Sequence, residues 1–481
     1  MSHRSRPRAL RVFALAALAH LVVALPASAQ KKKATDPTEC PYCHNDPKLL
    51  EAAGLVSHGG FVFGKADSTV KVDELLPECD LRWLETAHFR IGFGLGSWKV
   101  KLEDKKKTVA ELTKLKQFFP EVKPDTGVLD PWLRTHLYAQ RAEELYTRFL
   151  ELMNAQDAVF PEKTGTWTAG STYMGEGPYL GQLRKYEFFV VPTINSAVTF
   201  LTEHCGVQVR KSQRWHYTTL GSIALICSAE DGSLRTDAAL HGHLAFNLAH
   251  NLYDGFLHYN YDTPVWLHEG MAHFMEREVN PKYNSFDSDE GSIAQDTRKE
   301  NWKPDVLALI NAGKAPRMAE LIGLKRFSEL TLPHHYTTWS MIDFLVKTKP
   351  KELSEFLWAL KRNFSEQGLP TGEKLLDLHR TKFKELFGWN YAEFDEAWKA
   401  WALNAYKATT PKGSDPNGMP SQPGGTRPPG GGTIPTESTR SCTAPNGSEA
   451  SSRCTRPSCQ VHTNSSAVPR ITACGRPPSM E

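Results

Sequence analysis

The sequence lacks a strong charge of either sign, since 57 Lys and Arg residues oppose 54 Asp and Glu residues and leave a formal net charge of +3. Much of the small basic excess lies at the two ends of the chain, so the composition predicts no nucleic-acid-binding surface. The sequence also lacks, after residue 25, an apolar run long enough to span a bilayer. With 40% hydrophobic residues, the 481-residue chain can build a sizeable globular core, and we expect no integral membrane span in it after removal of an N-terminal signal.

The first 29 residues have the three parts of a secretory signal peptide. Four arginines between residues 4 and 11 precede an apolar run over residues 12–25, and Ala27-Ser28-Ala29 follows as a small-residue cleavage site. We therefore expect export to the periplasm or to the extracellular space. An uncleaved membrane anchor is the alternative, which the short apolar run, interrupted by His20, disfavours.

Residues 30–80 carry a Cys-x-x-Cys-His pentad, formed by Cys40, Cys43 and His44. The pentad resembles the attachment site of c-type haem, in which two thiols bond to the haem vinyl groups and the adjacent histidine binds the iron. That resemblance implies haem c as a cofactor, with His58 or a more distant residue as the second axial ligand. Two other interpretations remain open: a disulfide between the two cysteines, which an oxidising compartment allows, and a zinc site made by Cys40, Cys43, Cys79 and a histidine.

Between residues 81 and 406 the pattern changes from mixed to mostly helical. The predicted strands cover residues 86–93, 187–192 and 220–227, and the predicted helices before residue 240 cover 133–153 and 194–204. Helical periods separated by Gly and Pro then follow at 305–312, 317–324, 336–347, 352–361 and 383–386. We predict an α+β fold with a mixed lobe over 81–240 and a helical lobe over 241–406. Residues 407–481 are rich in Pro, Gly, Ser and Thr and are predicted to form a disordered tail.

The stretch from residue 240 to residue 276 concentrates histidines between two apolar periodic segments. In the first segment His243, Asn247 and His250 fall on one face of a predicted helix. In the second segment Glu269 and His273 lie one helical turn apart. Two helices in this arrangement can direct polar side chains at one point, so the stretch predicts a site where they meet.

The second segment resembles the W-L-x-E-G-x-A motif of gluzincin metallopeptidases of the peptidase-MA type. The match consists of Pro264, Trp266, Leu267, Glu269, Gly270 and Ala272. Glu269 also lies about twenty residues after His250, the spacing that this family uses between its HExxH motif and its third zinc ligand. The resemblance covers residues 81–406 and implies a zincin-like fold, zinc as the cofactor, and a substrate-pairing edge strand at residues 220–227.

The HExxH motif that should precede this segment is incomplete. Aligning His250 with its second histidine puts Phe246 at the first histidine and Asn247 at the catalytic glutamate. A phenyl ring cannot bind zinc, and an amide cannot take a proton from water. By the same resemblance, Tyr336 lies where gluzincins have an oxyanion-stabilising residue, although a packed tyrosine explains this position equally well.

A substitute set of metal ligands, His250, Glu269 and His273, is available on the two helices. Three outcomes remain open: a metal-free or repurposed site, a noncatalytic metal site, and a working hydrolase with rewired ligands. We expect an exported gluzincin-like protein with impaired or absent peptidase activity, which holds a polypeptide or a cell-envelope partner in its cleft. The alternatives are an active zinc metallohydrolase and a redox protein that carries haem on the Cys40 to His44 pentad.

Overall fold

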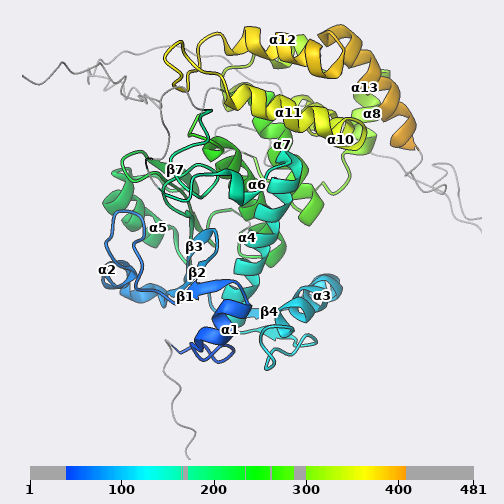
Figure 1. Ribbon diagram of the computed structural model, residues 1–481. Coiled ribbons are helices and arrows are strands. Elements are labelled where there is room, and N and C mark those ends of the chain that lie inside the picture. Colours follow the sequence, from blue (N-terminus) through cyan, green and yellow to red (C-terminus); the bar gives the residue numbers. More distant parts are fainter. Residues whose placement is uncertain are drawn as a thin grey trace, which may run out of the picture. The chain divides into compact units, whose positions relative to one another are not determined.

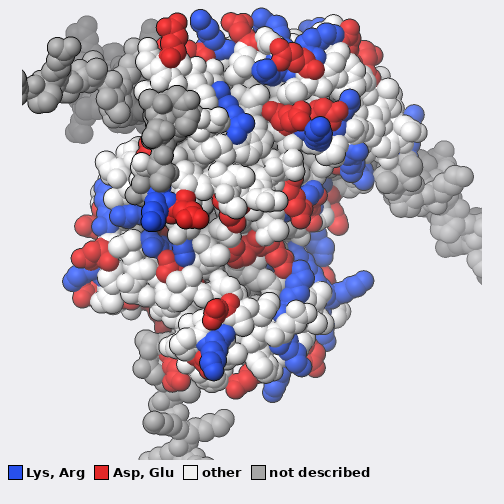
Figure 2. Space-filling view, viewed as in Figure 1, with Lys and Arg blue, Asp and Glu red and all other residues white. Residues whose placement is uncertain are grey.

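The computed structural model describes residues 39–407, except residues 164, 166–171, 233, 261–262 and 287–298. The predicted signal peptide and, apart from residue 407, the predicted tail lie outside the described residues. The described chain is a mixed α and β fold, as the sequence pattern predicts at this level. No helix in this part of the chain is long and apolar enough to cross a membrane. On the face seen in Figure 2, basic and acidic side chains lie interspersed.

A six-stranded mixed sheet forms the centre of the N-terminal half. Its spatial order is β1 (Leu55–Ser57), β2 (Arg82–Thr86), β3 (Phe89–Phe93), β6 (Tyr186–Val191), β8 (Ser222–Ser228) and β7 (Gln213–Tyr217). The three central strands β3, β6 and β8 run parallel, and the flanking pairs are antiparallel. A separate two-stranded ribbon pairs β4 (Trp98–Lys99) with β5 (Val128–Leu129).

The order of the strands corrects one expectation from the sequence. The strand predicted at residues 220–227 is β8, but it lies between β6 and β7 instead of at the edge of the sheet. Every residue of β8 is buried, which is typical of an interior strand covered on both faces. The edge strand on this side is β7, whose residues 213–216 are half-buried.

Helices pack on the sheet and then make up the C-terminal half (Figure 1). Their bounds are α1 (Pro47–Ala52), α2 (Thr69–Leu75), α3 (Lys105–Lys116), α4 (Pro131–Met153), α5 (Ile194–Phe200), α6 (Asp237–Gly255), α7 (Val265–Val279), α8 (Lys303–Asn311), α9 (Met318–Leu321), α10 (Leu332–Thr348), α11 (Pro350–Lys361), α12 (Leu375–Phe387) and α13 (Tyr391–Ala405). The central helix α6 packs on β8, on α4 and on α7, and α7 packs in turn on α10. Figure 1 shows α10 to α13, in yellow and orange, gathered away from β1, β2 and β3.

The predicted helical periods correspond to observed helices, with differences that have local causes. Helix α4 begins two residues before the predicted residue 133, because the Asp130 carboxylate accepts hydrogen bonds from the first free backbone amides and Pro131 occupies the first helical position. The helix predicted at 194–204 is α5 followed by a π-helical turn, Leu201–Cys205. The period at 383–386 is only the end of the longer helix α12.

One buried ion cluster ties together three helices that carry the core. Arg141 on α4 donates to the Glu111 carboxylate of α3 at 2.8 Å and to the Asp237 carboxylate of α6 at 3.1 Å. The Tyr138 hydroxyl also donates to Asp237, at 2.7 Å. Burial by itself raises the pKa of Asp237, but the Arg141 charge and these hydrogen bonds outweigh it and lower that pKa. The start of α6 is therefore fixed electrostatically as well as by apolar packing.

We expect Arg141→Met to lower the free energy of unfolding by roughly 3–5 kcal/mol, because two buried carboxylates lose their compensating charge. Arg148→Met is the matched control on the same helix. Arg148 pairs with Glu278 at 2.8 Å, but its side chain is 34% exposed, so its loss should cost roughly 1 kcal/mol or less. Denaturant unfolding of both variants measures the difference, and equal losses would contradict the role assigned to the cluster.

Glu187 is a fully buried carboxyl in the interior strand β6. Its Oε2 atom accepts a hydrogen bond from the Gly64 backbone amide at 2.9 Å. Burial raises the pKa of Glu187 to about 7, and the Gly64 bond only partly offsets this effect. The folded protein therefore holds a proton on Glu187 over a range in which the unfolded chain has released it.

The raised pKa predicts that this group destabilises the fold as the pH rises. The unfolded carboxyl loses its proton near its ordinary value of 4.5, whereas the folded one keeps it until about 7, so the destabilisation develops between these values and persists above them. Glu187→Gln, which keeps an acceptor for Gly64, should therefore raise the melting temperature more at pH 8 than at pH 4.5. Other titrating groups cancel in the comparison with the wild type. The same increment at both pH values would show that Glu187 ionises normally.

Candidate functional site

Three helices meet at the site that the sequence predicts between residues 240 and 276. Helix α6 starts where the Thr236 hydroxyl accepts a hydrogen bond from the Ala239 amide at 3.2 Å, and α7 starts after Pro264. The third helix, α10, approaches α7 closely at Gly270. A Cβ atom at Gly270 would lie 2.8 Å from Ile342 and 2.9 Å from the Thr338 carbonyl oxygen. The glycine after Glu269 is therefore required for α10 to reach the site.

The carboxylate of Glu269 lies at the centre of this meeting point. Its Oε2 atom lies 3.5 Å from Nε2 of His250 on α6. Its Oε1 atom lies 3.1 Å from Nε2 of His273, one turn later on α7, and 3.3 Å from Nδ1 of His335 on α10. The four side chains are 0–1% exposed. The structure thus places the three expected residues next to one another, but the group whose ligand atoms could share one ion consists of Glu269, His273 and the unpredicted His335, without His250.

The imidazoles compensate the burial of the Glu269 charge. Burial alone would raise the pKa of this carboxyl, but its contacts with His250, His273 and His335 outweigh burial and hold the pKa well below its usual range. Among the described residues, neither carboxylate oxygen has a partner in proper hydrogen-bond geometry, although imidazole nitrogens lie within 3.5 Å. The two imidazole nitrogens nearest Oε1, Nε2 of His273 and Nδ1 of His335, lie at hydrogen-bond distance from each other, 3.0 Å.

An outer contact orients His273. Its Nδ1 atom lies 3.3 Å from the Glu276 carboxylate, which in turn accepts a hydrogen bond from the Ser285 amide at 2.7 Å. Burial raises the pKa of Glu276. A carboxylate on the far nitrogen of an imidazole directs the other nitrogen at a metal ion, and here that other nitrogen is the one that faces Glu269.

Three of these residues have the composition and spacing of a zinc site. The ligand atoms of Glu269, His273 and His335 all lie within 4.8 Å of one another. Zinc ligands at about 2.1 Å in a tetrahedron are about 3.4 Å apart. The observed separations are close to this value: 3.1 and 3.3 Å from the carboxylate oxygen to the two imidazoles, and 3.0 Å between the imidazoles. The cluster could therefore hold a zinc ion with little movement.

The two altered positions of the expected HExxH motif have packing roles. The Phe246 ring lies with its centroid 4.8 Å from that of His250 and 5.0 Å from that of His273, so it packs against both imidazoles. The Asn247 amide donates to the His243 carbonyl oxygen at 2.9 Å and contacts the ring of the same histidine. The Asn247 side chain therefore hydrogen-bonds to the residue one turn earlier on α6.

Tyr336, the expected oxyanion stabiliser, lies beside the cluster as a packed aromatic residue. Its ring centroid lies 5.0 Å from that of Trp302, and the residue is 5% exposed. The neighbouring His335 enters the site instead. Sequence reasoning missed His335, although the pair His334-His335 at the start of a predicted helix was a signal. Which of these two histidines faces Glu269 depends on how α10 is oriented against α7, and the sequence does not show this.

The pentad at residues 40–44 does not fit a c-type haem. His44 is turned away from the two thiols, with its Nε2 atom 3.3 Å from the Glu121 carboxylate and its side chain 49% exposed. The Cys40 and Cys43 thiols are completely buried and each contacts an imidazole from another part of the chain. Cys79, the third cysteine of the zinc set expected from the sequence, lies in the separate apolar cluster around Phe61 and Trp83.

We expect His335→Ala to weaken Zn²⁺ binding at the Glu269 cluster by more than the roughly 10- to 100-fold that loss of an outer hydrogen-bond partner costs. His334→Ala is the control on the same helical turn, because His334 contacts Glu320 and caps α10 without touching Glu269. Titration of the metal-stripped variants with Zn²⁺ measures both affinities. Indistinguishable affinities in the two variants would remove His335 from the ligand set.

A comparison of the chain with protein-family models found no match, and a comparison with curated protein sequences found none either.

Proposed function

We propose that this chain is an exported, catalytically impaired gluzincin-like protein, whose Glu269 cluster holds a zinc ion without hydrolysing peptides. One observation carries the proposal: His250 and Glu269 face each other at 3.5 Å across α6 and α7, while the position of the catalytic base is an amide, Asn247. The closeness of His250 and Glu269 supports a zincin-like arrangement of the two helices. The amide at residue 247 supports the loss of peptide hydrolysis.

The chemical argument concerns the proton of the attacking water. Zinc-dependent peptide hydrolysis needs a carboxylate that accepts this proton, and an amide has no basic atom for it. Glu276, a buried carboxylate beside the cluster, contacts the far nitrogen of His273 and the Ser285 amide. It therefore orients a ligand and is directed away from the Glu269 side of the imidazole.

The burial of the cluster also supports a zinc ion that does not hydrolyse peptides. A catalytic zinc keeps one coordination position open to water and substrate, whereas a structural zinc is enclosed by protein. His250, Glu269, His273 and His335 are 0–1% exposed, and the Phe246 ring packs against two of the imidazoles. A peptide bond cannot reach an ion at this position without rearrangement of the helices.

The outer edge of the sheet supports a polypeptide as the partner of this chain. The strand β7 ends the described sheet and pairs there with β8, so its outer edge can accept an extended peptide as a further strand. In the resembling family substrate pairs with the edge strand before the active-site helix; in this chain the strand before α6 is the interior strand β8, so the proposed pairing edge is that of β7, one strand earlier. Its residues 213–216 are half-buried and include charged and aromatic side chains.

A working hydrolase is the second candidate, because Glu269, His273 and His335 make a set of two histidines and one glutamate. This composition also occurs in catalytic zinc sites that keep a fourth position for water. The candidate requires a proton acceptor other than residue 247 and an opening of the buried cluster. Both requirements can be tested on the same sample.

The experiment is a peptide-library digestion by the zinc-loaded chain, read by mass spectrometry. We expect stoichiometric zinc at the cluster and no cleavage that a chelator abolishes. Glu269→Gln is the matched variant, since it keeps the size of the side chain but weakens the metal site.

Cleavage by the wild type that both a chelator and Glu269→Gln remove would contradict the proposal and establish the second candidate. A chain that binds no zinc at this cluster would also contradict it. Residual cleavage that persists in Glu269→Gln would be assigned to a contaminating peptidase.

A further inference from the structure

A second cluster of metal-ligating side chains lies far from Glu269 in the sequence, at the N-terminal end of the described chain. It consists of Cys40, Cys43, His58 and His136, whose ligand atoms all lie within 4.8 Å of one another. The cysteines precede α1, His58 follows β1, and His136 is on α4. We propose that these four residues form a structural Zn²⁺ site that fastens residues 39–58 to α4. This proposal does not depend on the function proposed for the Glu269 cluster.

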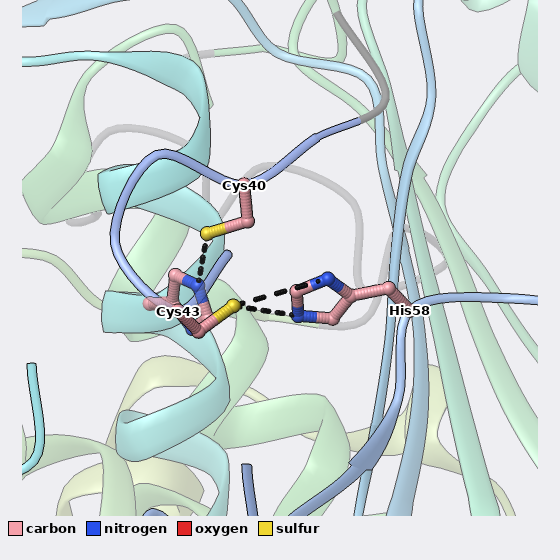
Figure 3. Close-up of side chains that lie close together, drawn as sticks. Cys40, Cys43 and His58 are labelled. Atoms are coloured by element: carbon pink, nitrogen blue, oxygen red, sulfur yellow. Dashed lines mark hydrogen bonds between the residues drawn. The ribbon is translucent and has the colours of Figure 1, made fainter. Parts of the chain in front are cut away.

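The distances between the side chains support a shared ion. The Cys40 sulfur lies 3.0 Å from Nε2 of His136, and the Cys43 sulfur lies 3.3 Å from Nε2 of His58. Figure 3 shows the Cys43 sulfur turned toward the His58 ring and the Cys40 sulfur turned toward the Cys43 backbone. Sulfur and nitrogen ligands of a tetrahedral zinc ion are about 3.6 Å apart, given bond lengths of about 2.3 and 2.1 Å. Small outward movements would therefore admit the ion.

Two backbone amides are directed at the Cys40 sulfur. The Tyr42 amide donates to the Cys40 sulfur at 3.4 Å, and the Cys43 amide also hydrogen-bonds to that sulfur (Figure 3). These amides favour the thiolate form of Cys40, but the hydrogen bond with the Cys43 thiol and burial outweigh them and raise its pKa, so Zn²⁺ must displace the thiol proton when it binds. His44 and Asn45 then adopt left-handed φ angles of 48° and 54° and turn the chain into α1.

An outer contact fixes the orientation of His58. Its Nδ1 atom hydrogen-bonds to the Asn45 side-chain oxygen, which leaves Nε2 directed at Cys43. The same histidine ring packs on Trp132 of α4, with centroids 5.1 Å apart. An imidazole held by an oxygen acceptor on its far nitrogen is the usual arrangement of a zinc ligand.

Burial and coordination number indicate a structural role. Cys40 and Cys43 are 0% exposed and His136 is 2% exposed, and four protein ligands leave no position for water or substrate. The fastened segment has few apolar contacts of its own, since Leu50 and Leu55 are its other core residues. Small segments with little core commonly need a metal or a disulfide to hold them.

The arrangement favours zinc over a disulfide at the same cysteines. In the described structure both thiols are free, and each is placed against its own imidazole. A disulfide would oxidise both thiols and leave His58 and His136 without their sulfur partners. Binding of Zn²⁺ releases the thiol protons and uses all four groups without a change of oxidation state.

The test is Co²⁺ substitution of the metal-stripped, reduced full-length chain, because thiolate ligands give Co²⁺ a sulfur-to-metal charge-transfer band. We expect the wild type to show this band, Zn²⁺ to abolish it, and Cys43→Ser to lose it. Cys79→Ser and His335→Ala should keep it, since neither residue belongs to this cluster. The sulfur band separates this site from the Glu269 cluster, which has no thiol.

Asn45→Gly provides a variant that tolerates the left-handed backbone and removes the contact to His58. We expect it to weaken Zn²⁺ binding roughly 10- to 100-fold. Absence of the band in the wild type, or its loss in Cys79→Ser, would overturn the proposal. Unchanged affinity in Asn45→Gly would remove His58 from the ligand set, and this result stands even if Cys43→Ser does not fold.

Discussion

The buried carboxylate of Glu269 is the constraint on which the C-terminal half of the fold depends. Placing an ionised carboxylate where no water reaches costs several kcal/mol unless other groups compensate it. Here the compensation comes from three imidazoles on three different helices, at 3.1–3.5 Å. The helices α6, α7 and α10 must therefore pack together for the charge to be tolerated, and Gly270 allows the closest of these approaches.

The same constraint explains why the site differs from a hydrolytic one. A zinc peptidase combines a charged, metal-binding centre with an opening and a base. In this chain a buried charged centre is present, but Phe246 packs against both His250 and His273, and the Asn247 amide hydrogen-bonds to the His243 carbonyl oxygen. The result is a cluster suited to hold an ion and to stabilise the meeting of three helices. Near the start of α4, the cluster of Cys40, Cys43, His58 and His136 likewise brings buried polar groups from separate segments together, here with softer sulfur atoms.

The sequence predicted the parts of the fold that depend on local periodicity and failed where distant segments meet. The spacing of His250, Glu269 and His273 was sufficient to place them on two helices that face each other. Residues such as His335 and His136 were not assigned, because each reaches its cluster from a separate helix far along the chain. The position of β8 inside the sheet was also missed, since strand order depends on tertiary pairing and not on the pattern of any one strand.

The most direct test of the central claim is anomalous X-ray diffraction at the zinc edge from crystals of the zinc-loaded chain. The account predicts an anomalous peak among Glu269, His273 and His335, enclosed by protein and bordered by the Phe246 ring. Absence of zinc from this cluster, or a zinc ion there with a water ligand in an open channel to solvent, would contradict it.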